Sequence, residues 1–130
     1  MPPIISLYIH IPFCRHRCAY CDFNTYARQE NLIPSYIQAV KTEIEQVAKL
    51  QTCQFEIGSI FFGGGTPTYI PVKGLQDILN TCERVFDVLQ ECEVSIEANP
   101  GTVSKESLYE LRQGGFNRIS LGMQSANINE

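Results

Sequence analysis

Residues 55–67 read FEIGSIFFGGGTP, an apolar run that leads directly into three glycines. The run from Phe55 to Phe62 predicts a β-strand, and we expect the glycines to end it. Pro71 then begins a predicted amphipathic helix. We expect the buried side of this helix to carry Leu75, Ile78, Leu79, Cys82, Val85, Phe86 and Leu89. The stretch therefore predicts one strand–turn–helix unit.

Strands and helices alternate on both sides of this unit. A strand over Ile4 to Ile11 and a helix over Pro34 to Leu50 are predicted before it, from period-two and helical apolar spacing. After it we predict a strand at Glu93 to Glu97, a helix from an N-cap at Ser104 through Leu111, and a strand at Asn117 to Leu121. The order βαβαβαβ predicts an α/β fold with parallel strands and right-handed helical crossovers. This is about half of a closed eight-unit barrel, so we expect a partial (β/α) barrel, truncated after about four strands.

Composition and charge limit the possible functions. The chain has 130 residues, 44% of them hydrophobic, and a net charge of −4 without a basic stripe. This balance fits one folded domain and argues against nucleic acid as a partner. The N-terminal residues, MPPII, lack the features of a secretory signal, and no apolar run is long enough for a transmembrane segment. We therefore expect a cytoplasmic protein.

Half of the six cysteines lie in one short loop, where Cys14, Cys18 and Cys21 have the spacing C-x3-C-x2-C. Clustered cysteines in a reducing compartment indicate metal or redox chemistry rather than disulfides. Three thiolates on one loop can hold three irons of a [4Fe–4S] cluster and leave the fourth iron open to an exchangeable ligand. The alternative is a structural zinc site completed by His10 or His16, although zinc sites prefer paired C-x2-C units.

The other three cysteines, Cys53, Cys82 and Cys92, are scattered along the chain. We predict that they are small apolar residues of the core rather than ligands.

Further candidate site residues follow the other predicted strands. The glycines at 63–65 would let a ligand approach the backbone closely, and Glu97 could accept hydrogen bonds from ribose hydroxyls. Gln124 lies just past the last strand. Taken singly, each of these has an ordinary structural explanation as a turn or loop residue. Because the carboxyl ends of parallel strands form one face of a barrel, we expect these residues and the cysteine loop to converge there.

Three segments together resemble a known family: YIHIPFC at residues 8–14, GGGTPT at 63–68 and SLGMQ at 120–124. They are similar to radical S-adenosylmethionine (SAM) proteins, and within them to the oxygen-independent coproporphyrinogen III oxidase group and its relative, the heme chaperone HemW. The resemblance covers essentially the whole chain. It implies that residues 1–130 are the N-terminal part of a radical SAM core domain, and that the later strands and the C-terminal domain of the family are absent.

The resemblance also implies roles for individual residues. Cys14, Cys18 and Cys21 match the [4Fe–4S] ligands. The residues that match SAM-binding or cluster-adjacent positions are Tyr8, Tyr20, Gly64, Gly65, Thr66, Glu97 and Gln124. His10, expected on the same strand face as Tyr8, could contact a porphyrin or transfer a proton, or could equally be a hydrogen-bonded core histidine.

One position departs from the oxidase pattern. The oxidase has a further cysteine two residues after its third, whereas this chain has Phe23 there. The resemblance at this position is to the HemW branch, which implies heme binding and delivery to an acceptor protein, with a low-potential electron donor such as flavodoxin or ferredoxin. Anaerobic coproporphyrinogen III oxidation, an enzymatic activity, is the alternative, and a structural zinc module is a distant third.

Overall fold

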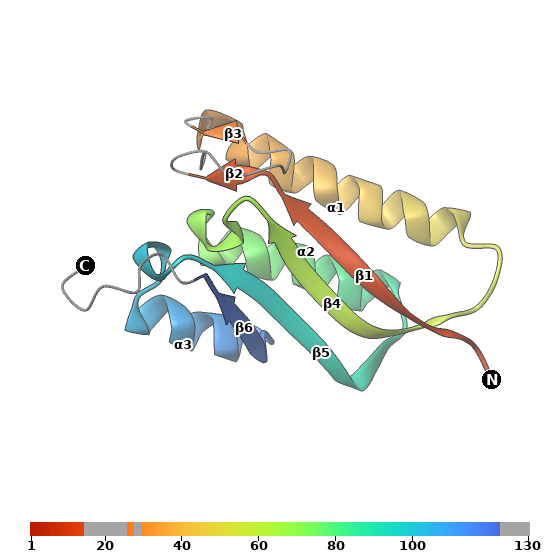
Figure 1. The fold of residues 1–130 in the computed structure, drawn as a ribbon. Helices are drawn as coiled ribbons and strands as arrows, with labels where there is room; N and C mark the ends of the chain where they lie inside the picture. The colour runs from red at the N-terminus through yellow and green to blue at the C-terminus, as the bar shows by residue number, and fades with distance from the viewer. Residues whose placement is uncertain (15–25, 28–29, 123–130) are drawn as a thin grey trace.

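The computed structural model describes residues 1–14, 26–27 and 30–122 of the chain. Strands and helices alternate along the described segments (Figure 1). In chain order the elements are β1 (Ile4–Ile11), β2 (Phe13–Cys14), β3 (Tyr26–Ala27), η1 (Glu30–Leu32), α1 (Ile33–Leu50), β4 (Glu56–Gly64), η2 (Pro67–Tyr69), α2 (Val72–Val85), β5 (Val88–Ala98), η3 (Pro100–Thr102), α3 (Lys105–Gln113) and β6 (Arg118–Leu121).

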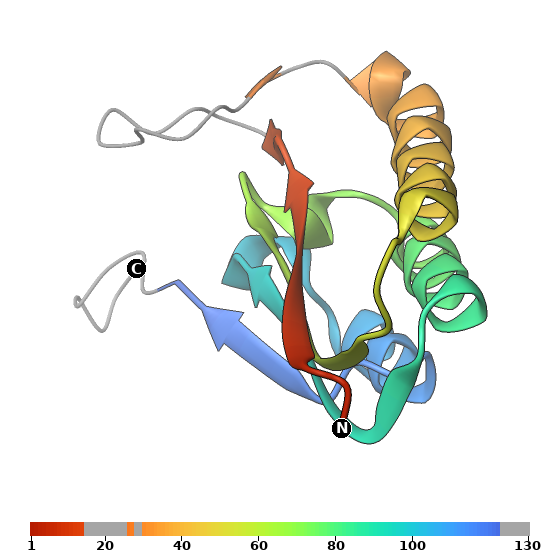
Figure 2. The ribbon, with the colours of Figure 1, turned by 90° about the vertical axis from the view of Figure 1, so that its right-hand side faces the viewer.

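The main sheet has the strand order β1-β4-β5-β6, and every neighbouring pair is parallel. The short strands β2 and β3 form a separate pair. Helices α1, α2 and α3 all lie on one face of the main sheet (Figure 2). We call the opposite face the open face. The parallel α/β architecture predicted from the alternating pattern is therefore confirmed.

The hydrophobic core lies between the sheet and the three helices. At its centre are fully buried side chains of β4 and α2, including Ile60, Phe62 and Leu79. Burying one such side chain contributes about 1.5–3 kcal/mol. Gly74 allows α1 and α2 to approach closely, because a Cβ there would lie 2.5 Å from Cδ1 of Ile37.

Strand β4 contains an irregularity at Gly58 that determines which side chains reach the open face. In the pairing with β1, Ile5 lies opposite Ile57 but Ser6 lies opposite Ser59, so Gly58 is an extra residue. Beyond it, Ile60 is buried against the helices, whereas Ser59 hydrogen-bonds to Ser6 with an Oγ–Oγ distance of 2.6 Å.

Several predicted boundaries differ from the structure, among them the start of the third strand, which begins at Val88 rather than at Glu93. Helix α2 ends at Val85, so Leu89 lies in β5 rather than on the helix. The backbone of Phe86 is already extended, with φ −115° and ψ 158°, which ends the helix there. The second strand does not stop before the glycines, because Gly63 and Gly64 pair with His10 and Ile11 of β1.

One prediction about burial also fails, among the cysteines outside the loop. Cys82 and Cys92 are buried, as predicted, but Cys53 is exposed, so its assignment to the core was wrong. Cys53 lies in the connection between α1 and β4, which runs outside the packed layers.

Helix α3 begins as the sequence predicts and ends at Gln113, two residues after the predicted Leu111. Ser104 and Ser107 form a reciprocal capping box at its start, and Gly115 follows its end with φ +111°.

Within the described residues, no helix combines the length and the apolar character that crossing a membrane would require.

Candidate functional site

The described candidate residues gather at the carboxyl ends of β1, β4 and β5. Tyr8 and His10 lie near the end of β1, Gly64 ends β4, and Glu97 is the penultimate residue of β5. Cys14 follows β1 directly, in the short strand β2. The expected convergence is therefore present for these residues. Cys18, Cys21, Tyr20 and Gln124 lie outside the described residues, so their predicted positions stay predictions.

Residues 63–66, which we call the glycine loop, are joined to residues 11–13, just before Cys14, by two backbone hydrogen bonds. The N–H of Gly65 donates to the carbonyl oxygen of Ile11 at 2.7 Å, and the N–H of Thr66 donates to that of Phe13 at 2.8 Å. A Cβ on Gly65 would lie 2.6 Å from the same Phe13 oxygen, closer than non-bonded atoms approach. The loop therefore fixes the backbone next to Cys14, and this requires glycine at position 65.

Glu97 is linked to the glycine loop by its side chain. The N–H of Gly64 donates to Oε1 of Glu97 at 3.3 Å, which joins the ends of β4 and β5. Gly64 has φ +119°, a conformation that favours glycine, and a Cβ there would lie 2.7 Å from the carbonyl oxygen of Ile11. The position of the Glu97 carboxylate thus depends on a backbone shape that other residues adopt only under strain.

The sequence interpretation gave no separate role to Gly63, yet this residue is central to the site. A Cβ on Gly63 would lie 2.4 Å from Oε1 of Glu97, 2.6 Å from Cε1 of Phe61 and 3.1 Å from Cε2 of Tyr8. The missing side chain is what allows these three groups to meet. Its place two residues after Phe61, on the same face of the strand, is the signal that could have identified it.

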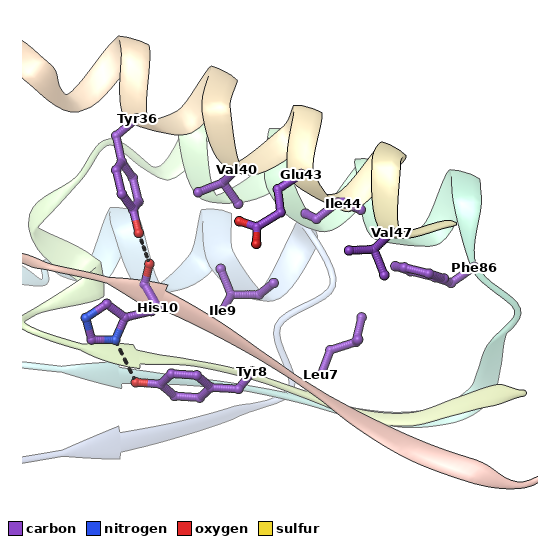
Figure 3. A pocket seen from close by; sticks show the side chains of 10 residues that line it. All are labelled: Leu7, Tyr8, Ile9, His10, Tyr36, Val40, Glu43, Ile44, Val47 and Phe86. Atoms are coloured by element: carbon purple, nitrogen blue, oxygen red, sulfur yellow. Dashed lines mark hydrogen bonds between the residues drawn. The ribbon is translucent and has the colours of Figure 1, made fainter. Parts of the chain in front are cut away.

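Tyr8 and His10 form a hydrogen-bonded pair on the open face, with 3.1 Å between the Tyr8 hydroxyl and Nδ1 of His10. From the helix side, the Tyr36 hydroxyl donates to the backbone oxygen of His10 at 2.5 Å (Figure 3). Partial burial, and secondarily the nearby charge of Glu97, raise the pKa of the Tyr8 phenol above its ordinary value. Tyr8 is therefore neutral at physiological pH and can donate a hydrogen bond.

A largely apolar groove of about 280 Å³ lies between β1 and α1 (Figure 3). Tyr8 and His10 lie at its border and so connect it with the open face. Glu43 adds a carboxylate to the lining, and the remaining residues are Leu7, Ile9, Tyr36, Val40, Ile44, Val47 and Phe86.

These residues suit a ligand that approaches the backbone and carries hydrogen-bond donors. The glycine loop has no side chain that would block the approach, and Glu97 and the Tyr8 hydroxyl supply an acceptor and a donor beside it. Cys14 adds a thiol next to this cradle. The described residues therefore bring a hydrogen-bond acceptor, a hydrogen-bond donor and one of the three loop cysteines to the same end of the sheet.

A family model described as the Radical SAM superfamily matches residues 8–129. The chain belongs to this superfamily. Its members use SAM and an iron–sulfur cluster, so a cofactor pair of this kind is what the family implies for the chain.

Individual radical SAM proteins resemble the chain over nearly its whole length. The chain is 40% identical over 124 residues to the oxygen-independent coproporphyrinogen III oxidase of Synechocystis sp. and 42% identical over 122 residues to the heme chaperone HemW of Bacillus subtilis. These alignments cover 95% and 92% of the chain but only 27% and 32% of the two relatives. The chain therefore spans about a third or less of the length of these proteins.

A solved structure, that of coproporphyrinogen III oxidase (HemN) from Escherichia coli, a radical SAM enzyme, superimposes with a TM-score of 0.87 at 34% identity. The match covers 98% of this chain and 29% of that one. The chain therefore has the α/β fold of the matched part of this radical SAM enzyme, with four parallel strands in the described main sheet.

Proposed function

We propose that residues 1–130 are the N-terminal part of a radical SAM core domain, and that Cys14, Cys18 and Cys21 ligate a [4Fe–4S] cluster. The observation that carries this proposal is the direct linkage of the glycine loop to both Glu97 and the segment before Cys14. Because the Glu97 carboxylate and the segment before Cys14 are both hydrogen-bonded to residues 64–66, this linkage supports a cluster ligand and a ligand-binding carboxylate at one site. The open iron of such a cluster would take the amine and carboxylate of SAM.

The chain's own residues would then bind and orient SAM. Gly64, Gly65 and Thr66 would accept the methionine moiety, Glu97 the nucleoside hydroxyls, and Tyr8 would donate a hydrogen bond from its neutral phenol. Tyr20 would lie beside the cluster, and Gln124 would contact a further ligand. When bound and reduced, the cluster supplies the electron that cleaves SAM, and the protein supplies binding and orientation.

For the whole protein we propose heme handling of the HemW type: binding of heme and its delivery to an acceptor protein. Phe23, in place of a further cysteine, supports this choice, as do the several relatives named heme chaperone HemW. A low-potential electron donor such as flavodoxin or ferredoxin would reduce the cluster. The cytoplasm is the proposed compartment, because three clustered thiolates require a reducing environment.

The second candidate is oxygen-independent coproporphyrinogen III oxidation. The relative of this name in Synechocystis and the match to the Escherichia coli enzyme favour it. Heme transfer and oxidation require different partners, so the two candidates make different predictions.

Anaerobic reconstitution with iron and sulfide tests the cluster. We expect a brown protein with iron and sulfide in equal amounts, whose electron paramagnetic resonance signal after reduction changes when SAM is added. Cys14→Ala should abolish the cluster, whereas Cys53→Ala, which removes an exposed cysteine outside the site, should leave it intact. A colourless protein that retains only zinc would overturn the cluster and favour the zinc module.

Product analysis separates chaperone from oxidase. The reconstituted chain and a full-length relative are incubated with coproporphyrinogen III, SAM and a low-potential reductant. We expect no protoporphyrinogen, and we expect heme added to the relative to pass to apoprotein acceptors. Formation of protoporphyrinogen would contradict the chaperone proposal and establish the oxidase.

A further inference from the structure

Tyr8 and Phe61 are cross-strand partners on the open face. They lie directly opposite each other in the register of β1 and β4. Their rings are stacked, with centroids 5.9 Å apart and an interplanar angle of 19°. Such pairs are a unit of sheet stabilisation, and offset stacking is a preferred aromatic geometry.

The position of Phe61 differs from that of the neighbouring Phe62. Phe62 points to the helix side, is fully buried and packs edge-on against Phe116 at 5.1 Å. Phe61 points to the open face and is only half buried. The two consecutive phenylalanines therefore lie on opposite faces of the sheet. Packing in the hydrophobic core does not explain why position 61 carries an aromatic ring.

Gly63 brings the Phe61 ring to the edge of the candidate site. The space that a Cβ on Gly63 would occupy is bordered by Cε1 of Phe61, Oε1 of Glu97 and Cε2 of Tyr8. Phe61 thus contacts one side of Tyr8, while the Tyr8 hydroxyl reaches Nδ1 of His10 at 3.1 Å. With these contacts the Tyr8 ring is held although 55% of the residue is exposed.

We propose that Phe61 is a positioning residue of the SAM site. Its ring fixes the orientation of the Tyr8 ring and thereby the direction in which the Tyr8 hydroxyl donates a hydrogen bond to the ligand. This inference rests on the proposed function, in which Tyr8 and Glu97 contact SAM. Phe61 itself touches neither the cluster nor the reacting atoms in this proposal. An aromatic ring is required at position 61, whereas an aliphatic side chain of similar size is not sufficient.

Phe61→Leu tests the proposal, with Phe61→Tyr as the conservative variant. Phe55→Leu is the matched control, because Phe55 is also half buried and contacts an aromatic ring, that of Phe86 at 5.8 Å, at the opposite end of β4 from Gly64. SAM affinity is measured by equilibrium dialysis on the cluster-loaded chain. We expect Phe61→Leu to weaken SAM binding about two- to tenfold at unchanged iron content, and Phe61→Tyr and Phe55→Leu to bind like the parent. Equal affinity of Phe61→Leu and the parent would overturn the proposal.

A double-mutant cycle with Tyr8→Ala separates positioning from a general structural effect. If Phe61 acts through Tyr8, Phe61→Leu should weaken binding no further in the Tyr8→Ala background. Additive losses would show that Phe61 acts independently of Tyr8 and would refute the inference.

A measurement without SAM keeps the inference distinguishable from the proposed function. The rings of Tyr8 and His10 have centroids 5.8 Å apart, so their protons should show a nuclear Overhauser contact in the chain as purified. We expect this contact to be lost in Phe61→Leu and kept in Phe61→Tyr and Phe55→Leu. If the parent binds no SAM, the proposed function fails, and this contact alone decides whether Phe61 positions Tyr8. Its persistence in Phe61→Leu would refute that role.

Discussion

The carboxylate of Glu97 and the backbone N–H of Gly64 are hydrogen-bonded at 3.3 Å across the ends of two neighbouring strands. The acceptor comes from β5 and the donor from the left-handed glycine that ends β4. The same carboxylate lies close enough to Tyr8 to influence its ionisation. The Glu97 side chain, at the end of β5, thus hydrogen-bonds to the glycine loop and also acts electrostatically on Tyr8.

Replacing Glu97 with glutamine should lower the pKa of Tyr8. Glutamine keeps an acceptor for the Gly64 N–H but removes the negative charge that disfavours the phenolate. The pKa should remain above its ordinary value of 10.0, because partial burial is the larger cause of its elevation. Ultraviolet titration of the tyrosinate band, taken as the difference from Tyr8→Phe, measures this value. Glu91→Gln, an exposed carboxylate elsewhere on β5, should leave the pKa unchanged; an equal change in both variants would contradict the assigned electrostatic contact.

An alanine at position 63 should damage the site more than the fold. Its Cβ would overlap the Glu97 carboxylate and the Phe61 ring and press on Tyr8, and such overpacking costs about 1–3 kcal/mol. We expect at least about a tenfold loss of SAM affinity, equivalent to about 1.4 kcal/mol, in the cluster-loaded chain. The matched control is Gly114→Ala, whose Cβ would meet only the flexible side chain of Gln76, outside the site. Comparable SAM affinities in the two variants would argue against the role given to Gly63.

An alanine at position 64 should lower stability directly. The backbone there has φ +119°, and the Cβ would collide with the carbonyl oxygen of Ile11. Strain of this kind costs about 1–3 kcal/mol, to be measured as the free energy of unfolding in urea. Gly114→Ala is the control, because Gly114 has φ −79° and its Cβ would meet only the flexible side chain of Gln76. The prediction fails if Gly64→Ala is no less stable than Gly114→Ala.

The buried thiol of Cys82 should make the chain less stable at alkaline pH. Burial, followed by the charge of Glu83, raises the pKa of Cys82 from 9.0 to about 12. A raised folded-state pKa contributes stability below pH 9 that is lost as the pH rises from 9 towards 12, with a slope of about 1.4 kcal/mol per pH unit. Urea unfolding at several pH values should therefore show a shallower alkaline decline in Cys82→Ala than in the parent. Cys53→Ala, at an exposed cysteine, should retain the parental slope, and a parental slope in Cys82→Ala would exclude this contribution.

The sequence predicted those elements whose side-chain period is unambiguous. The strand from Ile4 to Ile11 has the predicted bounds, because polar Ser6, Tyr8 and His10 alternate with apolar residues that pack on the helices. The end of α2 was not predicted. Val85, Phe86, Val88 and Leu89 form an apolar stretch interrupted only by Asp87, and this stretch fits a continuing helix as well as the beginning of a strand.

The site was predictable to the extent that parallel strands bring their carboxyl ends together. That rule placed Gly64, Gly65 and Glu97 near one another, and the structure confirms their proximity. The rule contains no distances, however, so it could not predict that Gly63 leaves the space shared by Tyr8, Phe61 and Glu97. Such contacts depend on the register between β1 and β4. That register depends on the extra residue Gly58, which the apolar pattern of the sequence does not indicate.

The extra residue at Gly58 reverses the alternation of side chains between the two faces of β4. Below it Ile57 faces the helices, and above it Ile60 and Phe62 do, although a regular strand would turn residues three apart to opposite sides. A strand that ran through Gly58 without this irregularity would have two incompatible phases: one would keep Ile57 inside, and the other would keep Phe62 inside. In the first phase Phe61 would enter the core and Phe62 would lie on the open face. The irregularity at Gly58 thus decides whether Phe61 or Phe62 lies on the open face, although Gly58 lies three residues earlier in the strand.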